Sequence, residues 1–147
     1  MKIIVSACLL GRKCKYDGGD NYREDLVELL KGHEVIPVCP ETAGGLPTPR
    51  IPCEIVNGVV TDREGHCRDA EFRAGAALCL EEALKAHADL AILQSRSPSC
   101  GPKEIYDGTF SGKLIPGQGI FARMLTERGI KVADIEDFKN FSAFEQR

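Results

Sequence analysis

Four short apolar runs separated by helical patterns are the feature that most constrains the fold of this 147-residue chain. The runs cover residues 3–7, 34–38, 89–93 and 130–133, and each is too short to be a buried helix. Apolar residues recur at helical spacing over residues 21–31, 69–86, 119–128 and 135–144. Strands that alternate with helices pair in parallel, because each helix returns the chain across the sheet. We therefore predict one α/β domain over residues 1–147, with a mostly parallel, Rossmann-like sheet and helices on both faces.

Two further segments add irregular structure to this sheet. Residues 54–61 predict a small β-hairpin insertion, because Asn57-Gly58 lies between β-branched residues and is a strong turn signal. Residues 40–52 contain four prolines and the pair Gly44-Gly45, which predicts an ordered but irregular loop.

The overall charge excludes two broad classes of function. Nineteen Lys and Arg against 22 Asp and Glu give a net charge of −3, whereas general nucleic-acid binding requires a basic surface. No apolar stretch approaches the ~18 residues of a membrane span. We therefore expect neither general nucleic-acid binding nor membrane insertion. The oligomeric state is left open, with a homodimer among the alternatives.

Seven cysteines are the unusual part of the composition. The first residues contain no secretory signal, because Ile3-Ile4-Val5 is far shorter than an apolar signal core. We therefore expect a reducing, cytoplasmic location, where cysteines bind metal or act in catalysis more often than they form disulfides.

Three of the cysteines follow predicted strands. Cys8, Cys39 and Cys100 each lie at or shortly beyond the carboxyl end of a strand, and Cys14 lies in the same loop as Cys8. Loops that leave adjacent parallel strands converge at that edge of the sheet, and ligands bind there. If the strands are neighbours, these thiols meet at one point.

The other cysteines lack such a pattern. Cys79 lies in the middle of the longest predicted helix, beside its apolar stripe, which favours a buried structural thiol. Cys53 and Cys67 flank the hairpin, and structural roles are the simplest interpretation for both. No pair forms a Cys-x-x-Cys, the usual local signal of zinc ribbons and thioredoxin-type sites.

Rigid turns and small residues surround Cys39 and Cys100, as the sequences Cys39-Pro40-Glu41 and Ser97-Pro98-Ser99-Cys100-Gly101-Pro102 indicate. Such loops allow backbone N–H groups to approach a cluster's sulfur atoms closely. Three cysteines would leave one iron without a protein ligand, which is typical of a Lewis-acid site rather than of an electron carrier. Spacing alone leaves an iron–sulfur cluster, a zinc site and a purely structural role open.

Several ordered motifs resemble one small bacterial family, long catalogued as a domain of unknown function and similar to the thiouracil desulfidases. The resemblance covers nearly the whole chain. It rests on Ser6-Ala7-Cys8-Leu9-Leu10-Gly11, Cys14-Lys15-Tyr16-Asp17-Gly18, Pro37-Val38-Cys39-Pro40-Glu41, Gly44-Gly45-Leu46-Pro47, Pro49-Arg50, Ser97-Pro98-Ser99-Cys100-Gly101, Ile105-Tyr106-Asp107-Gly108 and Phe110-Ser111-Gly112.

The resemblance implies a 4Fe-4S cluster with three protein ligands and one open iron. Matched by motif, the ligands are Cys8, Cys39 and Cys100, and Cys14 is a candidate alternative ligand. The implied activity is hydrolytic removal of sulfur from a small thiolated compound, such as conversion of thiouracil to uracil plus sulfide. The metal would bind the sulfur, and water would attack the carbon without net electron transfer.

Polar residues near these cysteines are candidates for the remaining chemistry. Glu41 is the best candidate base, because it lies two residues after Cys39. Ser99, and secondly Ser97, can hydrogen-bond the substrate, although each hydroxyl can equally cap its turn. Arg50 and Arg96 can orient a polar ring or clamp their loops.

Two other functions fit the same cysteines. One is a non-catalytic protein that stores or passes sulfide or persulfide and does not depend on Glu41. The other is a zinc-binding or purely structural α/β module.

Overall fold

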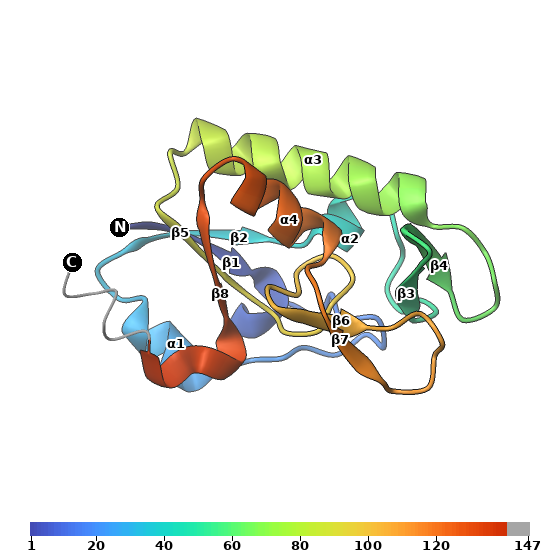
Figure 1. The fold of residues 1–147 in the computed structure, drawn as a ribbon. Helices are drawn as coiled ribbons and strands as arrows, with labels where there is room; N and C mark the ends of the chain where they lie inside the picture. The colour runs from blue at the N-terminus through green and yellow to red at the C-terminus, as the bar shows by residue number, and fades with distance from the viewer. Residues whose placement is uncertain (141–147) are drawn as a thin grey trace.

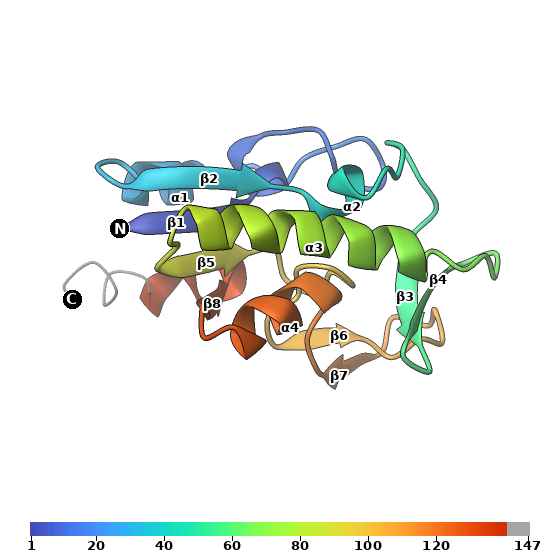
Figure 2. The same ribbon diagram turned by 90° about the horizontal axis from the view of Figure 1, so that it is seen from above.

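Four parallel strands form the central sheet, in the order β2-β1-β5-β8 (Figure 2). The strands are β1 (Lys2–Ser6), β2 (Glu34–Val38), β5 (Leu90–Leu93) and β8 (Lys131–Asp134). This computed structural model describes residues 1–140. The predicted parallel sheet is confirmed, and each strand lies within one residue of its expected range. Strand β1 is an inner strand of the sheet. Strand β2 lies on one side of it, and β5 followed by β8 lies on the other.

Helices cover both faces of the sheet, as predicted (Figure 1). Successive residues of a strand point to opposite faces, so Ile4 packs into one core while Ile3 and Val5 pack into the other. Helices α3 (Asp69–Lys85) and α4 (Ile120–Glu127) cover the first core. Helix α1 (Glu24–Leu29) and the 3₁₀ helices η1 (Ala7–Leu10) and η2 (Ile135–Asn140) cover the second.

Helix α1 is much shorter than the predicted 21–31. The backbone N–H groups of Asn21 and Arg23 donate to the carbonyls of Cys8 and Leu9, and Tyr22 N donates to the Asp20 side chain. These bonds hold residues 21–23 beside η1, so helix α1 cannot begin at these residues. They also place Asn21 beside Cys8.

The predicted terminal helix over 135–144 is only partly described. Residues 135–140 form η2, with non-helical backbone at Asp137, and residues 141–144 lie outside the described part of the chain.

The proline-rich segment 40–52 begins with a helix, which corrects the expectation of a wholly irregular loop. Helix α2 (Pro40–Ala43) starts at Pro40, because the first helical position needs no backbone donor. It packs against α3 through two glycines: a Cβ on Gly44 would overlap the Glu71 carbonyl oxygen, and one on Gly75 would overlap that of Pro40. This contact fixes Cys39 and Glu41, which flank Pro40.

Two hairpins lie beyond the carboxyl ends of the sheet strands (Figure 2). The predicted hairpin is β3 (Cys53–Val56) and β4 (Val59–Asp62), with positive φ at Asn57 and Gly58 as its turn requires. The second, β6 (Glu104–Tyr106) and β7 (Leu114–Pro116), was not predicted, because its strands have three residues each among turn signals. Buried Glu54 in β3 accepts hydrogen bonds from Gly108 N and Phe110 N and so joins the two hairpins.

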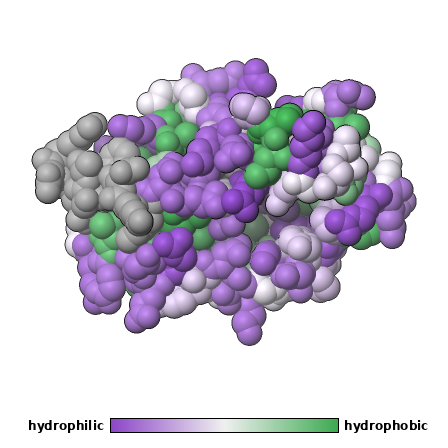
Figure 3. All heavy atoms as spheres, turned by 60° about the horizontal axis from the view of Figure 1, so that its bottom comes forward, coloured by the Kyte–Doolittle hydropathy of each residue, from purple (hydrophilic) through white to green (hydrophobic). Residues whose placement is uncertain are grey.

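Polar residues cover most of the face seen in Figure 3, and apolar residues form only small patches there. Within residues 1–140, no helix combines the length and the apolar character that crossing a bilayer requires.

Candidate functional site

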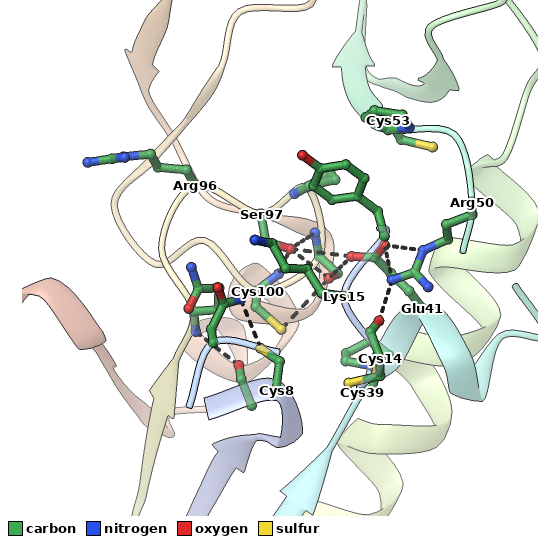
Figure 4. A pocket seen from close by; sticks show the side chains of 18 of the residues that line it. Cys8, Cys14, Lys15, Cys39, Glu41, Arg50, Cys53, Arg96, Ser97 and Cys100 are labelled. Atoms are coloured by element: carbon green, nitrogen blue, oxygen red, sulfur yellow. Dashed lines mark hydrogen bonds and ion pairs between the residues drawn. The ribbon is translucent and has the colours of Figure 1, made fainter. Parts of the chain in front are cut away.

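The carboxyl ends of β1, β2 and β5 border one pocket of about 500 Å³. Because β1 lies between β2 and β5, the loops after these strands leave the sheet next to one another, as at the ligand sites of open α/β sheets. Cys8 in η1, Cys39 after β2 and Cys100 after β5 all line this pocket. The three residues expected to lie at this edge of the sheet therefore line one pocket, and Cys14 lines it with them (Figure 4).

Each of the three cysteines has a polar group beside its sulfur atom. Asn21 Nδ2 donates to Cys8 Sγ at 3.5 Å, and Thr42 Oγ1 lies 3.2 Å from Cys39 Sγ. Ser99 Oγ lies 3.7 Å from Cys100 Sγ. Hydrogen bonds to sulfur stabilise thiolates and tune metal centres that they bind.

Cys14 and Cys39 form an unequal pair. A hydrogen bond to Cys39 and burial raise the pKa of the Cys14 thiol far above its ordinary value. The same bond, with help from Thr42, outweighs burial and lowers the pKa of Cys39 to about 6. The Cys14 thiol therefore favours ionisation of Cys39.

Cys8 and Cys100 differ from Cys39 in their protonation. Burial raises the pKa of both thiols, although Asn21 lowers that of Cys8 and Ser6 and Ser99 lower that of Cys100. Both would be deprotonated by a bound cation, because a metal removes the proton of a coordinating thiol.

The cysteines of this pocket are the candidate ligands of a metal group. Among the residues that the structure describes, no three Cys, His, Asp or Glu side chains converge on one point where they could hold a metal ion. In a cluster each thiolate binds a different iron, so its cysteines surround a volume instead of meeting at a point. Cys8, Cys39 and Cys100 lie around this pocket, each with a polar group beside its sulfur atom.

Glu41 lies between Arg50 and the two serines of the 97–99 turn. Its Oε2 accepts a hydrogen bond from Ser99 Oγ at 2.8 Å and a longer one from Ser97 Oγ at 3.4 Å. The side chain is only 15% exposed. All three predicted polar residues therefore meet, although Glu41 is 56 and 58 positions from the two serines in sequence.

The two serines have different surroundings. Ser97 Oγ accepts from the backbone N–H groups of Ser99 and Cys100, both at 3.1 Å. These bonds occupy both of its lone pairs, so Ser97 can only donate further, either to Glu41 or to Ser99 Oγ at 2.9 Å. Ser97 thus shapes the turn before Cys100, whereas Ser99 directly contacts Glu41.

Of the two roles that the sequence left open for Arg50, orienting a polar ring or clamping its loop, the observed contacts match the clamp. It pairs with Glu41 Oε1, and the remaining donors of its guanidinium bind oxygen atoms of this part of the fold. Arg96 pairs with Glu136 at 2.7 Å and extends away from the cysteines in Figure 4, although it borders the pocket.

The remaining cysteines divide between the pocket, the core and the surface. Cys79, a residue of α3, is buried in the core, as predicted. Cys67 is exposed and lies outside the pocket. Cys53 lines the pocket, where burial raises its pKa to about 12. This position of Cys53 was not predictable from the sequence, because the hairpin's location over the sheet edge depends on its contact with the 106–112 turn.

Comparison with known proteins extends these observations over the whole chain. The family model described as 2-thiouracil desulfurase matches residues 3–137. The uncharacterized protein YbbK of Bacillus subtilis (strain 168) is 38% identical over 140 residues, covering 88% of this chain and 93% of that protein.

A solved structure of the [4Fe-4S]-dependent thiouracil desulfidase TudS matches the fold with a TM-score of 0.91 and 38% sequence identity. The match covers 99% of this chain and 97% of TudS. Sequence motifs, fold and family model agree, and this chain belongs to the 2-thiouracil desulfurase family.

Proposed function

We propose that this chain is a desulfidase that hydrolytically removes sulfur from a thiocarbonyl compound such as a thiolated nucleobase, with thiouracil as the model substrate. Its cofactor would be a 4Fe-4S cluster held by Cys8, Cys39 and Cys100, with one iron open. The observation that carries the proposal is the convergence of these cysteines on one pocket with Glu41 and Ser99. The family and the [4Fe-4S]-dependent TudS support it.

The cysteines have distinct parts in this proposal. Cys39 is the ligand best prepared in the metal-free protein, because its pKa is lowered to about 6 by the Cys14 thiol. Cys14 remains protonated and donates a hydrogen bond to the Cys39 sulfur, so we assign it to support of the cluster. When bound, the cluster would act as a Lewis acid on the substrate's sulfur and make the adjacent carbon more electrophilic.

Glu41 would accept and return the protons of the hydrolysis, and Ser99 would hydrogen-bond to it. Glu41 Oε2 accepts a proton from water as the oxygen attacks the thiocarbonyl carbon, and a carbon–oxygen bond forms. The carbon–sulfur bond then breaks, and its electron pair leaves with the sulfur. The protons of the water end on the sulfide, directly or through Glu41. No atom is oxidised or reduced, so the reaction needs no electron donor.

The pocket suits a small, planar substrate. Its volume of about 500 Å³ lies within the range of small-molecule sites. The Ser99 hydroxyl already contacts Glu41 at 2.8 Å and can turn to a polar atom of the substrate when water occupies the base.

The experiment that tests this proposal replaces Glu41 with Gln in anaerobically reconstituted protein. We expect turnover of thiouracil to fall by about 10²–10⁴-fold, the usual range for loss of a general base, with iron content unchanged. Glu81→Gln, which changes an exposed carboxyl on α3, is the matched control and should keep wild-type turnover.

Retained turnover in Glu41→Gln would exclude Glu41 as the base. Iron-loaded wild-type protein that binds sulfide but releases none from any thiocarbonyl compound would favour the second candidate, a non-catalytic sulfide or persulfide carrier. The unequal Cys14–Cys39 pair is the observation that favours that candidate, because a low-pKa thiolate is a good nucleophile toward sulfur.

A further inference from the structure

Arg50 is the most completely bonded side chain of the site. Its Nε donates to Glu41 Oε1 at 3.0 Å, and its Nη2 forms an ion pair with the same oxygen at 3.0 Å. Nη2 also donates to the Cys14 carbonyl at 2.9 Å, and Nη1 donates to the Pro47 carbonyl and to Thr48 Oγ1, both at 3.1 Å. The side chain is 8% exposed. A guanidinium has five N–H groups, and four of those of Arg50 donate hydrogen bonds within the protein.

The two bonds to Glu41 end on the same oxygen atom. Arg50 therefore fixes Oε1 and leaves Oε2 free to face Ser99 and Ser97 on the opposite side of the pocket (Figure 4). A carboxylate held at one oxygen cannot rotate about its terminal bond without losing both contacts. Oε2, the oxygen that would act as the base, therefore stays directed at Ser99 and Ser97.

Arg50 also connects parts of the chain that carry different site residues. It bonds to helix α2 through Glu41, to the loop after η1 through the Cys14 carbonyl, and to the proline-rich segment that it belongs to. The backbone reinforces this connection, because Arg50 N donates to the Tyr16 carbonyl at 2.7 Å. Each of the three guanidinium nitrogen atoms of Arg50 thus donates to an oxygen atom of the protein.

We propose that Arg50 is a positioning residue: it holds Glu41 so that Oε2 faces Ser99, and it acts on the reaction only through that carboxylate. The inference rests on the proposed function and adds a residue to it. Lysine cannot replace Arg50, because an ammonium group lacks the planar fork that reaches Glu41, the Cys14 carbonyl and Pro47 together.

A double-mutant cycle on iron-loaded protein tests this role. Arg50→Lys keeps the charge and should lower kcat for thiouracil by about 10–100-fold, because misplacing a catalytic group by about 1 Å costs up to 10²-fold. KM and iron per chain should stay close to wild type. In the Glu41→Gln background, Arg50→Lys should cause no further loss of kcat, because a residue that acts through Glu41 has nothing left to position.

Arg23→Lys is the matched control, because Arg23 also pairs with a carboxylate through two nitrogen atoms, on Asp25 at 3.0 and 2.8 Å, outside the pocket. It should keep the wild-type kcat. A loss of kcat from Arg50→Lys that persists in the Glu41→Gln background overturns the inference. So does a loss of iron, an increase in KM at unchanged kcat, or a wild-type kcat in Arg50→Lys. Wild type and Arg23→Lys that bind iron but are both inactive would instead contradict the proposed function.

Discussion

At the scale of single residues, the site contains two pairs of residues of the same type whose members have different surroundings. Cys14 and Cys39 are neighbours of the same type, yet the pKa of Cys14 is raised and that of Cys39 is lowered. Ser97 and Ser99 are two positions apart, yet the backbone occupies the first and Glu41 engages the second. Sequence reasoning named all four residues, but their division of roles depends on hydrogen bonds that no spacing pattern encodes.

The Cys14–Cys39 pair predicts the pH dependence of thiol reactivity in iron-free protein. Because the folded pKa of Cys39 is lowered to about 6, its thiolate is present above about pH 6 and is lost as the pH falls through that value. Iodoacetamide should alkylate Cys39 with this midpoint, measured by mass spectrometry of the peptides. Cys79, whose pKa is raised to about 12 by burial, should stay unmodified over the same range.

In Cys14→Ala the donor to Cys39 is absent, so the alkylation midpoint of Cys39 should move to higher pH. An unchanged midpoint would mean that Cys14 does not stabilise the Cys39 thiolate.

The two serines predict different losses when each is replaced by alanine. Ser99→Ala removes the hydroxyl nearest to Glu41 Oε2 and should lower kcat by about tenfold or more, with little change in stability. Ser97→Ala leaves two buried backbone N–H groups without their acceptor, so it should cost about 1–3 kcal/mol of unfolding free energy. Chemical denaturation and steady-state kinetics on both variants measure the contrast. Equal effects on kcat and stability in the two variants would contradict the assignment.

At the scale of elements, the site is placed by a close contact between two helices. Gly44 and Gly75 allow α2 to touch α3, and this contact holds Glu41 in its first turn and Cys39 just before it. Sequence analysis identified α3 but missed α2, because four prolines in 13 residues obscured a helix of only four residues. It also predicted α1 too long, since the hydrogen bonds of residues 21–23 to η1 are tertiary contacts.

Gly75→Ala should disrupt this contact. A Cβ at residue 75 would overlap the Pro40 carbonyl and would lie 2.6 Å from Gly44 N, so α2 must move. We expect a loss of about 1–3 kcal/mol of unfolding free energy, together with reduced iron uptake because Cys39 moves with α2.

Ala74→Gly, on the exposed side of the same helix, is the control. It should cost about 0.5–1 kcal/mol through helix propensity alone and should leave iron uptake unchanged. A Gly75→Ala variant as stable and as rich in iron as wild type would refute the proposed helix contact.

At the scale of the whole molecule, parallel topology brings distant cysteines together. The sheet and its order of elements were predictable, because alternating strand and helix patterns permit few arrangements. The convergence of Cys8, Cys39 and Cys100 followed once β1 lay between β2 and β5. The second hairpin, the place of Cys53 and the Arg50–Glu41 pair were not predictable, because each depends on contacts between segments that are distant in sequence or too short for periodicity.

The most direct test of the three-cysteine site is iron per chain after anaerobic reconstitution with iron and sulfide. A cluster with three cysteine ligands predicts about four irons in the wild type, in Cys14→Ala and in Cys67→Ala, where Cys67 is an exposed thiol outside the pocket. It predicts loss of the cluster in Cys8→Ala, Cys39→Ala and Cys100→Ala. Wild-type protein that takes up no iron, or a Cys39→Ala variant that keeps four irons while Cys14→Ala loses them, would contradict it.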